Sequence, residues 1–214
     1  FCENVKGLTI HDRGRTFKVI KGAFEEIGYT VFHQILNSKD FGVPQNRERI
    51  YLVCFRNDIA PKEFLFPEGD KKDVSIRDLS DVYVNTLRAH KARHEAAGHG
   101  FGYVIRELDG IAGTIVCGGM GREGNLLIDH REHSMIPTTH IKGHINTEDI
   151  RKMTPREWAR LQGFPDDFKW DLADTHMYKQ FGNSVTVNVI EAIAQKIKEV
   201  LDESEEEKHE TVGQ

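Results

Sequence analysis

The sequence predicts an α/β fold that carries a second, smaller and loop-rich domain. Strand-like stretches at 1–5, 29–36 and 50–55 enclose an amphipathic helix, an order typical of part of an α/β sheet. The run 50–55 is continuously apolar, which suits a strand covered on both faces. From about residue 61 to 150 the chain is rich in glycine and holds seven of the eleven histidines, and helical patterns return only afterwards.

The first helix is predicted over residues 15–27. Phe17, Ile20, Phe24 and Ile27 recur at helical spacing, and Gly28 follows as a C-terminal stop. The β-rich stretch 29–36 predicts a strand, and residues 37–49 are polar and are expected to form a loop before the strand at 50–55.

Two helices are predicted after residue 150. Thr154-Pro155-Arg156-Glu157 is a capping box with proline at the first helical position, and this helix should end near Gly163. A long helix should follow Asn183 or Ser184, because apolar residues then recur on one face: Ile190, Ile193, Ile197 and Leu201.

The predicted domains are 1–66, part of the main sheet, then 67–150, the small loop-rich domain, and 151–201, helices that return to the main domain. The tail 202–214 is expected to be acidic and disordered. From Glu199 onward there are seven acids and one base, whereas the rest of the chain has 28 bases and 27 acids. The net charge of -5 therefore comes from the tail, and the near-neutral body permits nucleic-acid binding without arguing for it.

Composition excludes several classes of protein. The chain has 214 residues, 38% of them hydrophobic and 29% charged, which is a globular composition. The three cysteines form no C-x-x-C pair, which argues against a disulfide framework or a zinc finger. No apolar run approaches the roughly 18 residues of a membrane helix. We expect free thiols, a cytoplasmic location and no membrane partner.

Four short motifs, taken together, identify a family resemblance. They are Glu3-Asn4-Val5, Gln45-Asn46-Arg47-Glu48-Arg49, the segment from Thr154 to Pro165, and Phe181-Gly182-Asn183-Ser184-Val185. In this order and spacing they resemble the later motifs of the DNA cytosine-5 methyltransferases of bacterial restriction–modification systems. The match is dense over about 1–60 and 150–200 and weak in the middle, where that family carries its variable target-recognition domain.

The resemblance implies a partial Rossmann-like methyltransferase domain that uses S-adenosyl-L-methionine and acts on double-stranded DNA. The family's glycine-rich cofactor loop and its Pro-Cys loop, which carries the nucleophilic thiolate, have no counterpart in this sequence. We therefore expect a C-terminal half that is inactive alone. Its partner would be an upstream half, encoded in the same gene or as a separate polypeptide.

The resemblance also implies roles for individual residues. Glu3, with Asn4 beside it, would be the acid at cytosine N3, and Arg49, with Arg47, would serve the O2 and phosphate side. Asn183, Ser184 and Val185 would lie by the cofactor. Each motif has a structural alternative when taken alone: a solvated glutamate, a salt-bridged loop, and a turn with a helix N-cap.

The middle region offers candidate DNA contacts in the stretch 114–122. Its glycines allow close approach to a ligand, and an arginine there could read guanine or grip phosphate. The predicted contacts are Thr114, Gly118, Gly119, Met120, Gly121 and Arg122. A flexible hairpin turn is the alternative. His90 and His94 are four residues apart but lack a cysteine or carboxylate partner, so no metal is expected.

A second class of function stays open at this point. The chain could be a non-catalytic DNA-binding specificity subunit, or an inactive remnant. The joint presence of Glu3, Arg49 and Asn183 favours the enzyme, because a binding subunit needs none of them.

Overall fold

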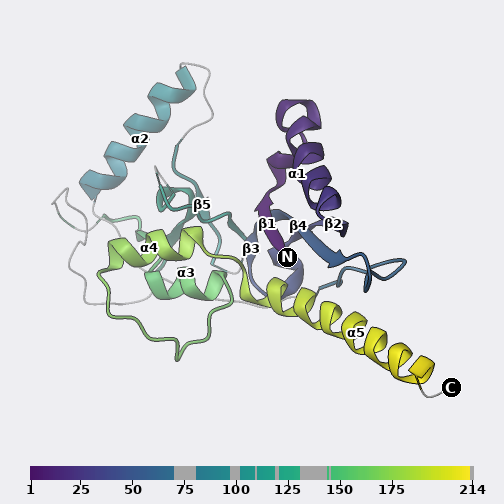
Figure 1. Cartoon of the computed structure of the whole chain (residues 1–214). Helices are drawn as coiled ribbons and strands as arrows, with labels where there is room; N and C mark the ends of the chain where they lie inside the picture. Colours follow the sequence, from purple (N-terminus) through teal and green to yellow (C-terminus); the bar gives the residue numbers. More distant parts are fainter. Residues whose placement is uncertain are drawn as a thin grey trace.

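The computed structural model describes residues 1–69, 81–96, 102–108, 110–118, 121–130, 144 and 146–212. In these ranges the chain forms two lobes (Figure 1). The sheet lobe contains β1 (Cys2–Val5), α1 (Arg15–Glu26), β2 (Tyr29–Asn37), β4 (Glu48–Arg56) and α5 (Val187–Val212). The second lobe contains α2 (Asp81–Ala96), β5 (Ile105–Arg106), β6 (Ala112–Gly113), β7 (Leu126–Ile128), β8 (Ile150–Lys152), α3 (Pro155–Leu161) and α4 (Asp174–Asn183).

The main sheet has the order β1-β4-β2, and β4 is antiparallel to both neighbours. The Rossmann-like domain implied by the resemblance would have a mainly parallel sheet, so this arrangement corrects that expectation for the part of the sheet that the described residues form. The connection from β2 to β4 is too short for a crossover, which needs a dozen or more residues, and the two strands therefore pair antiparallel. β1 and β2 run in the same direction on either side.

Both faces of the main sheet are covered, as the apolar run in β4 predicts. Phe17, Ile20 and Phe24 of α1 pack on one face against Ile50 and Leu52. On the other face α5 packs through residues such as Val189 and Ile193, next to Tyr51, Val53 and Phe55. α1 ends one residue earlier than predicted, and Gly28 follows it at φ +90, a conformation that favours glycine.

The segment between β2 and β4 has more structure than the predicted loop. It contains a 3-10 helix, η3 (Ser38–Phe41), and the short strand β3 (Gln45–Asn46). β3 pairs in parallel with β6 and so joins the two lobes. Near the N-terminus, two 3-10 turns, η1 (Lys6–Thr9) and η2 (His11–Gly14), connect β1 to α1.

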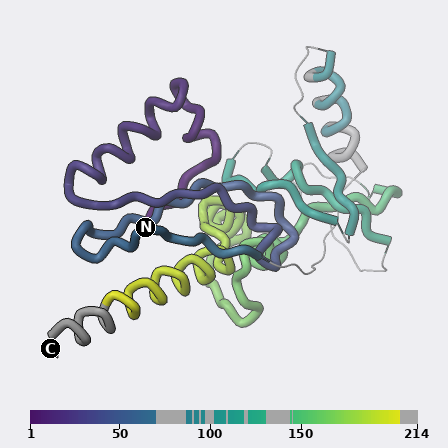
Figure 2. The backbone as a smooth tube through the Cα atoms, turned by 90° about the vertical axis from the view of Figure 1, so that its right-hand side faces the viewer, coloured from purple at the N-terminus to yellow at the C-terminus, as the bar shows by residue number. Residues whose placement is uncertain are grey.

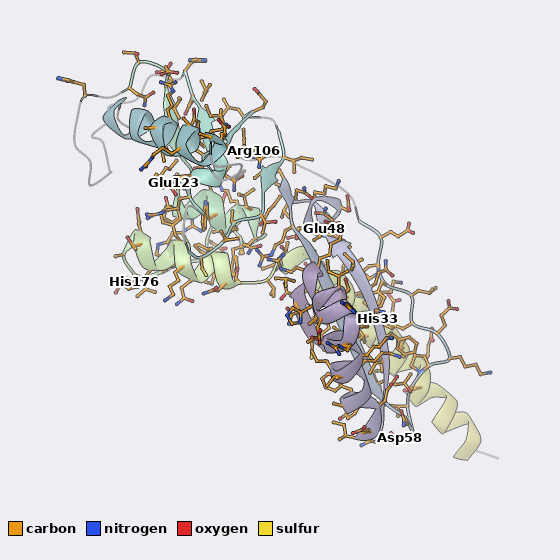
Figure 3. All side chains as sticks on the ribbon, turned by 90° about the horizontal axis from the view of Figure 1, so that it is seen from above. His33, Glu48, Asp58, Arg106, Glu123 and His176 are labelled. Atoms are coloured by element: carbon orange, nitrogen blue, oxygen red, sulfur yellow. The ribbon has the colours of Figure 1, made fainter. Side chains whose placement is uncertain are left out.

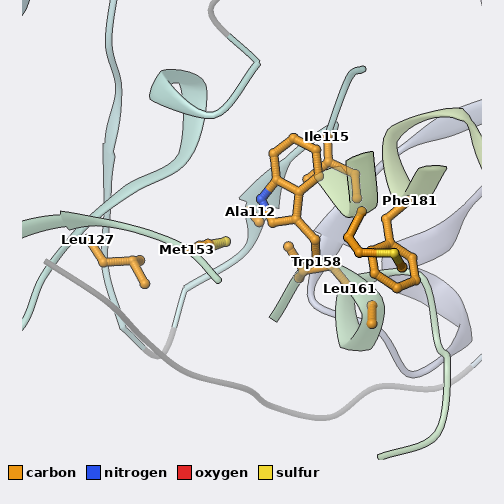
Figure 4. Close-up of a cluster of buried hydrophobic side chains, with 9 residues drawn as sticks. Ala112, Ile115, Leu127, Met153, Trp158, Leu161 and Phe181 are labelled. Atoms are coloured by element: carbon orange, nitrogen blue, oxygen red, sulfur yellow. The ribbon is translucent and has the colours of Figure 1, made fainter. Parts of the chain in front are cut away.

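The second lobe has its own core around α3 and α4. Trp158, Leu161 and Phe181 pack there with Ala112, Ile115, Leu127 and Met153 (Figure 4). α3 begins with the predicted capping box: the Glu157 amide donates to the Thr154 hydroxyl, and the Thr154 amide donates to the Glu157 carboxylate. α3 and α4 thus pack with residues 112–127, and α5 is the helix that covers the main sheet.

Three features of this lobe and of the C-terminus differ from expectation. The middle region contains the 16-residue helix α2, and another 3-10 helix, η4 (Glu123–Asn125), precedes β7. α4 was not predicted. α5 remains helical to Val212, although a disordered acidic tail was expected, because no proline or glycine interrupts the run and Lys198 pairs with Asp202 one turn away. The predicted boundary at 150/151 falls within β8, and the division into domains stays a prediction.

Labelled side chains mark the two lobes in the view from above. In Figure 3, His33 and Glu48 lie in the sheet lobe, whereas Arg106, Glu123 and His176 lie in the second lobe. Figure 2 shows α5 running from the junction of the lobes toward the C-terminus.

Across the described residues, no helix is both long and apolar enough to cross a membrane.

Candidate active site at the junction of the two lobes

Glu3 and Arg49 form an ion pair across neighbouring strands. The β1–β4 register places Glu3 opposite Tyr51 and Val5 opposite Arg49, so the two charged side chains are diagonal neighbours on one face of the sheet. Arg49 Nε lies 3.1 Å from Glu3 Oε1, and the side chains are only 12% and 20% exposed. The structure thus brings together an acid and a guanidinium that the sequence separates by 46 positions.

Asn4 lies on the other face of the same strand. Side chains alternate along a strand, so the neighbours of Glu3 point to the opposite side. Asn4 pairs with Ile50, whose side chain packs on the α1 face, and the Asn4 side-chain oxygen accepts a hydrogen bond from the Val5 amide. The structure therefore does not bring Asn4 together with Glu3 and Arg49.

Of the three free cysteines, two lie in strands of the main sheet and one lies in the second lobe. Cys2 precedes Glu3 in β1 and so faces the opposite side of the sheet. Cys54 is half-buried in β4, where burial raises the pKa of its thiol, and Cys117 is exposed in the second lobe. No cysteine of this chain shares a sheet face with Glu3 and Arg49.

Arg47 is buried at the point where the lobes meet. Its Nη1 donates to the Ile115 carbonyl at 3.1 Å, and its Nη2 donates to the Ser184 carbonyl at 2.8 Å. Burial, and then the charge of Arg49, lower the pKa of Arg47 to about 10, so the guanidinium stays protonated at neutral pH. Its guanidinium hydrogen-bonds to backbone carbonyls of two distant segments, and the role of Arg47 and Arg49 at O2 or phosphate stays a prediction.

The predicted cofactor segment lies beside this arginine, but it does not open the last helix. Asn183 is the last residue of α4, Ser184 is its C-cap, and α5 begins at Val187. The structural alternative of a turn with a helix N-cap at Gly182-Asn183-Ser184 is therefore wrong, and the last helix begins three residues later than Ser184. The Ser184 hydroxyl donates to the Phe181 carbonyl at 2.9 Å, as a C-terminal capping contact does.

The segment nevertheless fits one wall of a cofactor site. Asn183 is exposed, and Ser184 and Val185 are half-exposed. They immediately precede α5, the helix that covers the sheet face of Glu3 and Arg49, and the Ser184 carbonyl accepts a hydrogen bond from Arg47. An exposed amide and a hydroxyl with free acceptor capacity suit the amino-acid and ribose groups of S-adenosyl-L-methionine.

Buried polar side chains hold this segment in place, and these were missed from the sequence. Gln162 Nε2 donates to the carbonyls of Phe181 and Ser184, and its Oε1 accepts from the Thr186 hydroxyl. Gln45 Nε2 donates to the Leu161 carbonyl and to Gln162. We call this group the polar junction; it consists of Ser38, Gln45, Arg47, Gln162 and Thr186, none more than 4% exposed. Glutamine inside a turn or loop gives no pattern that marks it as buried.

The predicted DNA contacts have mixed surroundings. Thr114 donates its hydroxyl to the Asn46 carbonyl, and Gly118 is exposed. The Gly121 amide donates to the Gly118 carbonyl, and a Cβ on Gly121 would stand 2.3 Å from the Val116 carbonyl oxygen. Gly121 thus permits a tight turn, in line with the hairpin alternative. Arg122 lies over the Tyr178 ring at 5.3 Å. Gly119 and Met120 lie outside the described residues.

No metal centre emerges from the described side chains. Among them, no group of three or more histidine, cysteine or acidic side chains lies close enough to hold a metal ion. His90 and His94 belong to α2, but the structure does not describe their side chains, so the expectation about them is not tested.

Comparison with known proteins gives the family. The model of the C-5 cytosine-specific DNA methylase family matches residues 1–199. The chain is 54% identical to the type II methyltransferase M.HpaII of Haemophilus parainfluenzae, covering 94% of this chain and 60% of that protein. It is 41% identical to M.SsoII of Shigella sonnei, covering 94% and 52%. The chain therefore belongs to the C-5 cytosine-specific DNA methylase family, and it spans between half and two thirds of the length of these relatives.

Solved structures agree on the fold. The Schizosaccharomyces pombe Dnmt2 methyltransferase superimposes with a TM-score of 0.64 at 20% identity, over 94% of this chain and 66% of that one. An Entamoeba histolytica methyltransferase gives a TM-score of 0.61 at 21% identity, covering 94% and 61%. At such low identity the likeness concerns the fold, which is that of the methyltransferases.

Proposed function

We propose that this chain is the C-terminal part, or a subunit, of a DNA cytosine-5 methyltransferase of a restriction–modification system. It would act with an upstream part that carries the glycine-rich loop and the Pro-Cys loop. The observation that carries the proposal is the Glu3–Arg49 pair, which lies on the sheet face that α5 covers, and α5 begins shortly after the segment 183–185. The family and its type II relatives support the proposal.

The pair suits the electronic demand of the reaction. A thiolate from the upstream part adds to C6 of a cytosine, and negative charge then develops toward N3 and O2 of the ring. Glu3 would hold a proton toward N3, and Arg49 would stabilise the charge at O2 from a side chain that is always cationic. Asn183–Val185 would hold S-adenosyl-L-methionine, which would supply the electrophilic methyl group and leave as S-adenosylhomocysteine. Loss of the C5 proton and release of the thiolate from C6 would then restore the cytosine ring.

The base must leave the DNA stack to reach such a site, at a cost of a few kcal/mol. The sheet lobe and the second lobe would hold the duplex between them. We propose residues 67–150 as the target-recognition domain, with Thr114, Gly118 and Arg122 among its DNA contacts. Turns with exposed backbone and an arginine near them suit groove or phosphate contacts.

The first experiment tests whether the upstream part is needed. The isolated chain and the chain co-expressed with an upstream segment carrying both missing loops are incubated with tritiated S-adenosyl-L-methionine and unmethylated duplex DNA. We expect label at C5 of cytosine only from the pair. Turnover by the pure chain would contradict the absence of a nucleophile, and no label from a well-folded pair would favour the binding-only subunit.

The second experiment tests the role of Glu3. In the active pair, Glu3→Gln should lower kcat by about 10²- to 10⁴-fold, the usual contribution of a general acid, while DNA affinity changes little. Glu48→Gln is the matched control, because Glu48 lies on β4 next to Arg49 but pairs with Lys6 at 2.8 Å at an exposed position. The control should keep its rate. Equal loss of rate and DNA affinity in Glu3→Gln would remove the acid role.

A further inference from the structure

Two segments that the proposed function assigns to different ligands touch each other directly. Gly182 of α4 packs so closely on the segment 114–118 that a Cβ there would stand 2.6 Å from the Cys117 amide nitrogen and 2.8 Å from its Cα. Residues 114–118 belong to the proposed DNA-contact stretch, and 183–185 to the proposed cofactor wall. The two binding regions thus share a backbone-to-backbone interface.

On one side of this interface, side chains of the segment 45–47 hydrogen-bond to both the amide and the carbonyl of Ile115. The Ile115 amide donates to Gln45 Oε1 at 3.1 Å, and the Ile115 carbonyl accepts from Arg47 Nη1 at 3.1 Å. β3 adds its parallel pairing with β6 just before this point. The path of the chain through 112–115 is therefore set by the junction between β3 and β4.

The guanidinium of Arg47 also hydrogen-bonds to the other side of the interface, the segment 183–185. Its Nη2 donates to the Ser184 carbonyl, which also accepts from Gln162. The planar fork of an arginine fixes the directions of its donors relative to one another. Within the described residues, Arg47 is the side chain that hydrogen-bonds to both the Ile115 and the Ser184 carbonyl, and its Nε is buried without a hydrogen-bond partner.

We infer that Arg47 is a positioning residue that couples cofactor binding to DNA binding, by fixing the segments 114–118 and 183–185 relative to each other. This inference rests on the proposed function. A ligand that orders one segment orders the other through the shared guanidinium, so each ligand raises the affinity of the other by the same factor. Arg47 is thereby distinguished from Arg49, whose guanidinium faces Glu3.

The test measures that factor in the active pair of polypeptides. The dissociation constant of S-adenosylhomocysteine is measured by calorimetry with and without saturating unmethylated duplex DNA. In the wild type we expect DNA to tighten binding by a factor in the usual allosteric range, about 5- to 150-fold. In Arg47→Met and Arg47→Lys the factor should fall toward one, because neither side chain can bond both carbonyls in the same geometry.

Arg151→Met is the matched control. Arg151 is also fully buried; it pairs with Asp129 and Glu157 and donates to the Lys152 carbonyl, and none of these three residues belongs to either segment. A merely structural loss should lower stability in this variant and in Arg47→Met alike, and leave the coupling factor unchanged. Loss of the factor in the Arg47 variants only would support the inference.

A second measurement needs no ligand and uses the 214-residue chain. Hydrogen exchange should quicken in Arg47→Met at 115–118 and at 184–187 together, while amides of α1 report whether the variant is folded. Unchanged exchange at either segment, or a coupling factor that survives in both Arg47 variants, overturns the inference. If the wild-type pair methylates DNA but shows no coupling, only this inference fails; if it methylates nothing, the proposed function fails and takes the inference with it.

Discussion

Replacing Gly182 by alanine adds one methyl group to α4 where the chain has no room for it. Alanine normally stabilises a helix by up to about 1 kcal/mol relative to glycine. Here the new Cβ would stand 2.6 Å from the Cys117 nitrogen and 2.8 Å from the Val116 carbonyl carbon. These are backbone atoms held by the polar junction, and they cannot rotate aside as the end of a side chain can. Overpacking of this kind costs about 1–3 kcal/mol.

The net effect of Gly182→Ala should therefore be a loss of up to about 2 kcal/mol in the free energy of unfolding, once the helix gain is subtracted from the overpacking cost. Gly22→Ala in α1 is the matched control, because nothing lies within 4 Å of the added Cβ. That control should gain up to about 1 kcal/mol.

Urea unfolding of the 214-residue chain measures both changes. Circular dichroism follows the helices, and tryptophan fluorescence follows the second lobe, where Trp158 is buried. The same substitution should shift the midpoint in opposite directions at the two sites. The reasoning would be refuted if Gly182→Ala left the midpoint unchanged or raised it while Gly22→Ala raised it as expected.

Three further predictions concern stability and are checked by the same unfolding assay. Thr154→Ala removes the hydroxyl of the capping box and should cost about 1 kcal/mol, whereas Thr154→Ser should restore most of it. Thr186→Val removes a buried hydroxyl that hydrogen-bonds to Gln162 and Ser38, and should cost about 1–3 kcal/mol because its partners are left unpaired; a neutral result would show that water replaces it. Burial, with the charge of Glu3, raises the pKa of Tyr51 from 10.0 to about 12. The unfolded state then loses its proton first, so the Tyr51 contribution is complete below pH 10 and is lost as the pH rises toward 12. The difference in stability between wild type and Tyr51→Phe should show this decline, and a pH-independent difference would contradict it.

Local patterns were sufficient to predict the elements that bury one clear face. Phe17, Ile20 and Phe24 mark α1, and the capping box at Thr154 marks α3. The apolar run of β4 correctly predicts a strand covered on both faces. In each case the signal lies within a dozen residues, where periodicity and capping are readable.

α4 and α2 were missed because their signals are ambiguous or weak. α4 buries Met177, Phe181 and Gly182 among polar residues, and the Gly-Asn-Ser that ends it resembles the start of a helix. The same three residues can cap either end, so a single sequence does not decide between them. α2 has a weak apolar periodicity, and among its described side chains Leu87 is the one in a core cluster.

The candidate site was predictable only in part. The family resemblance names Glu3 and Arg49, and the structure places them within 3.1 Å of each other. The resemblance could not assign Asn4 to the opposite face of the sheet, because that assignment follows from strand alternation and register. Nor could it give the partners of Arg47, which lie 68 and 137 positions away. Such long-range polar contacts leave no periodic trace in the sequence.

The place of α5 in the chain has a consequence for how the protein is made. The sheet face formed by Tyr51, Val53 and Phe55 is covered by Val189 and Ile193, and the Ser38–Thr186 contact spans 148 positions. On the ribosome, the strands emerge long before the helix that shields them. For a chain synthesised at about 5–20 residues per second, this face stays bare for several seconds or longer, during which exposed apolar surface favours aggregation. The sheet lobe therefore cannot complete its core before α5 has been synthesised, and the first turns of α5 are the part that covers the exposed face.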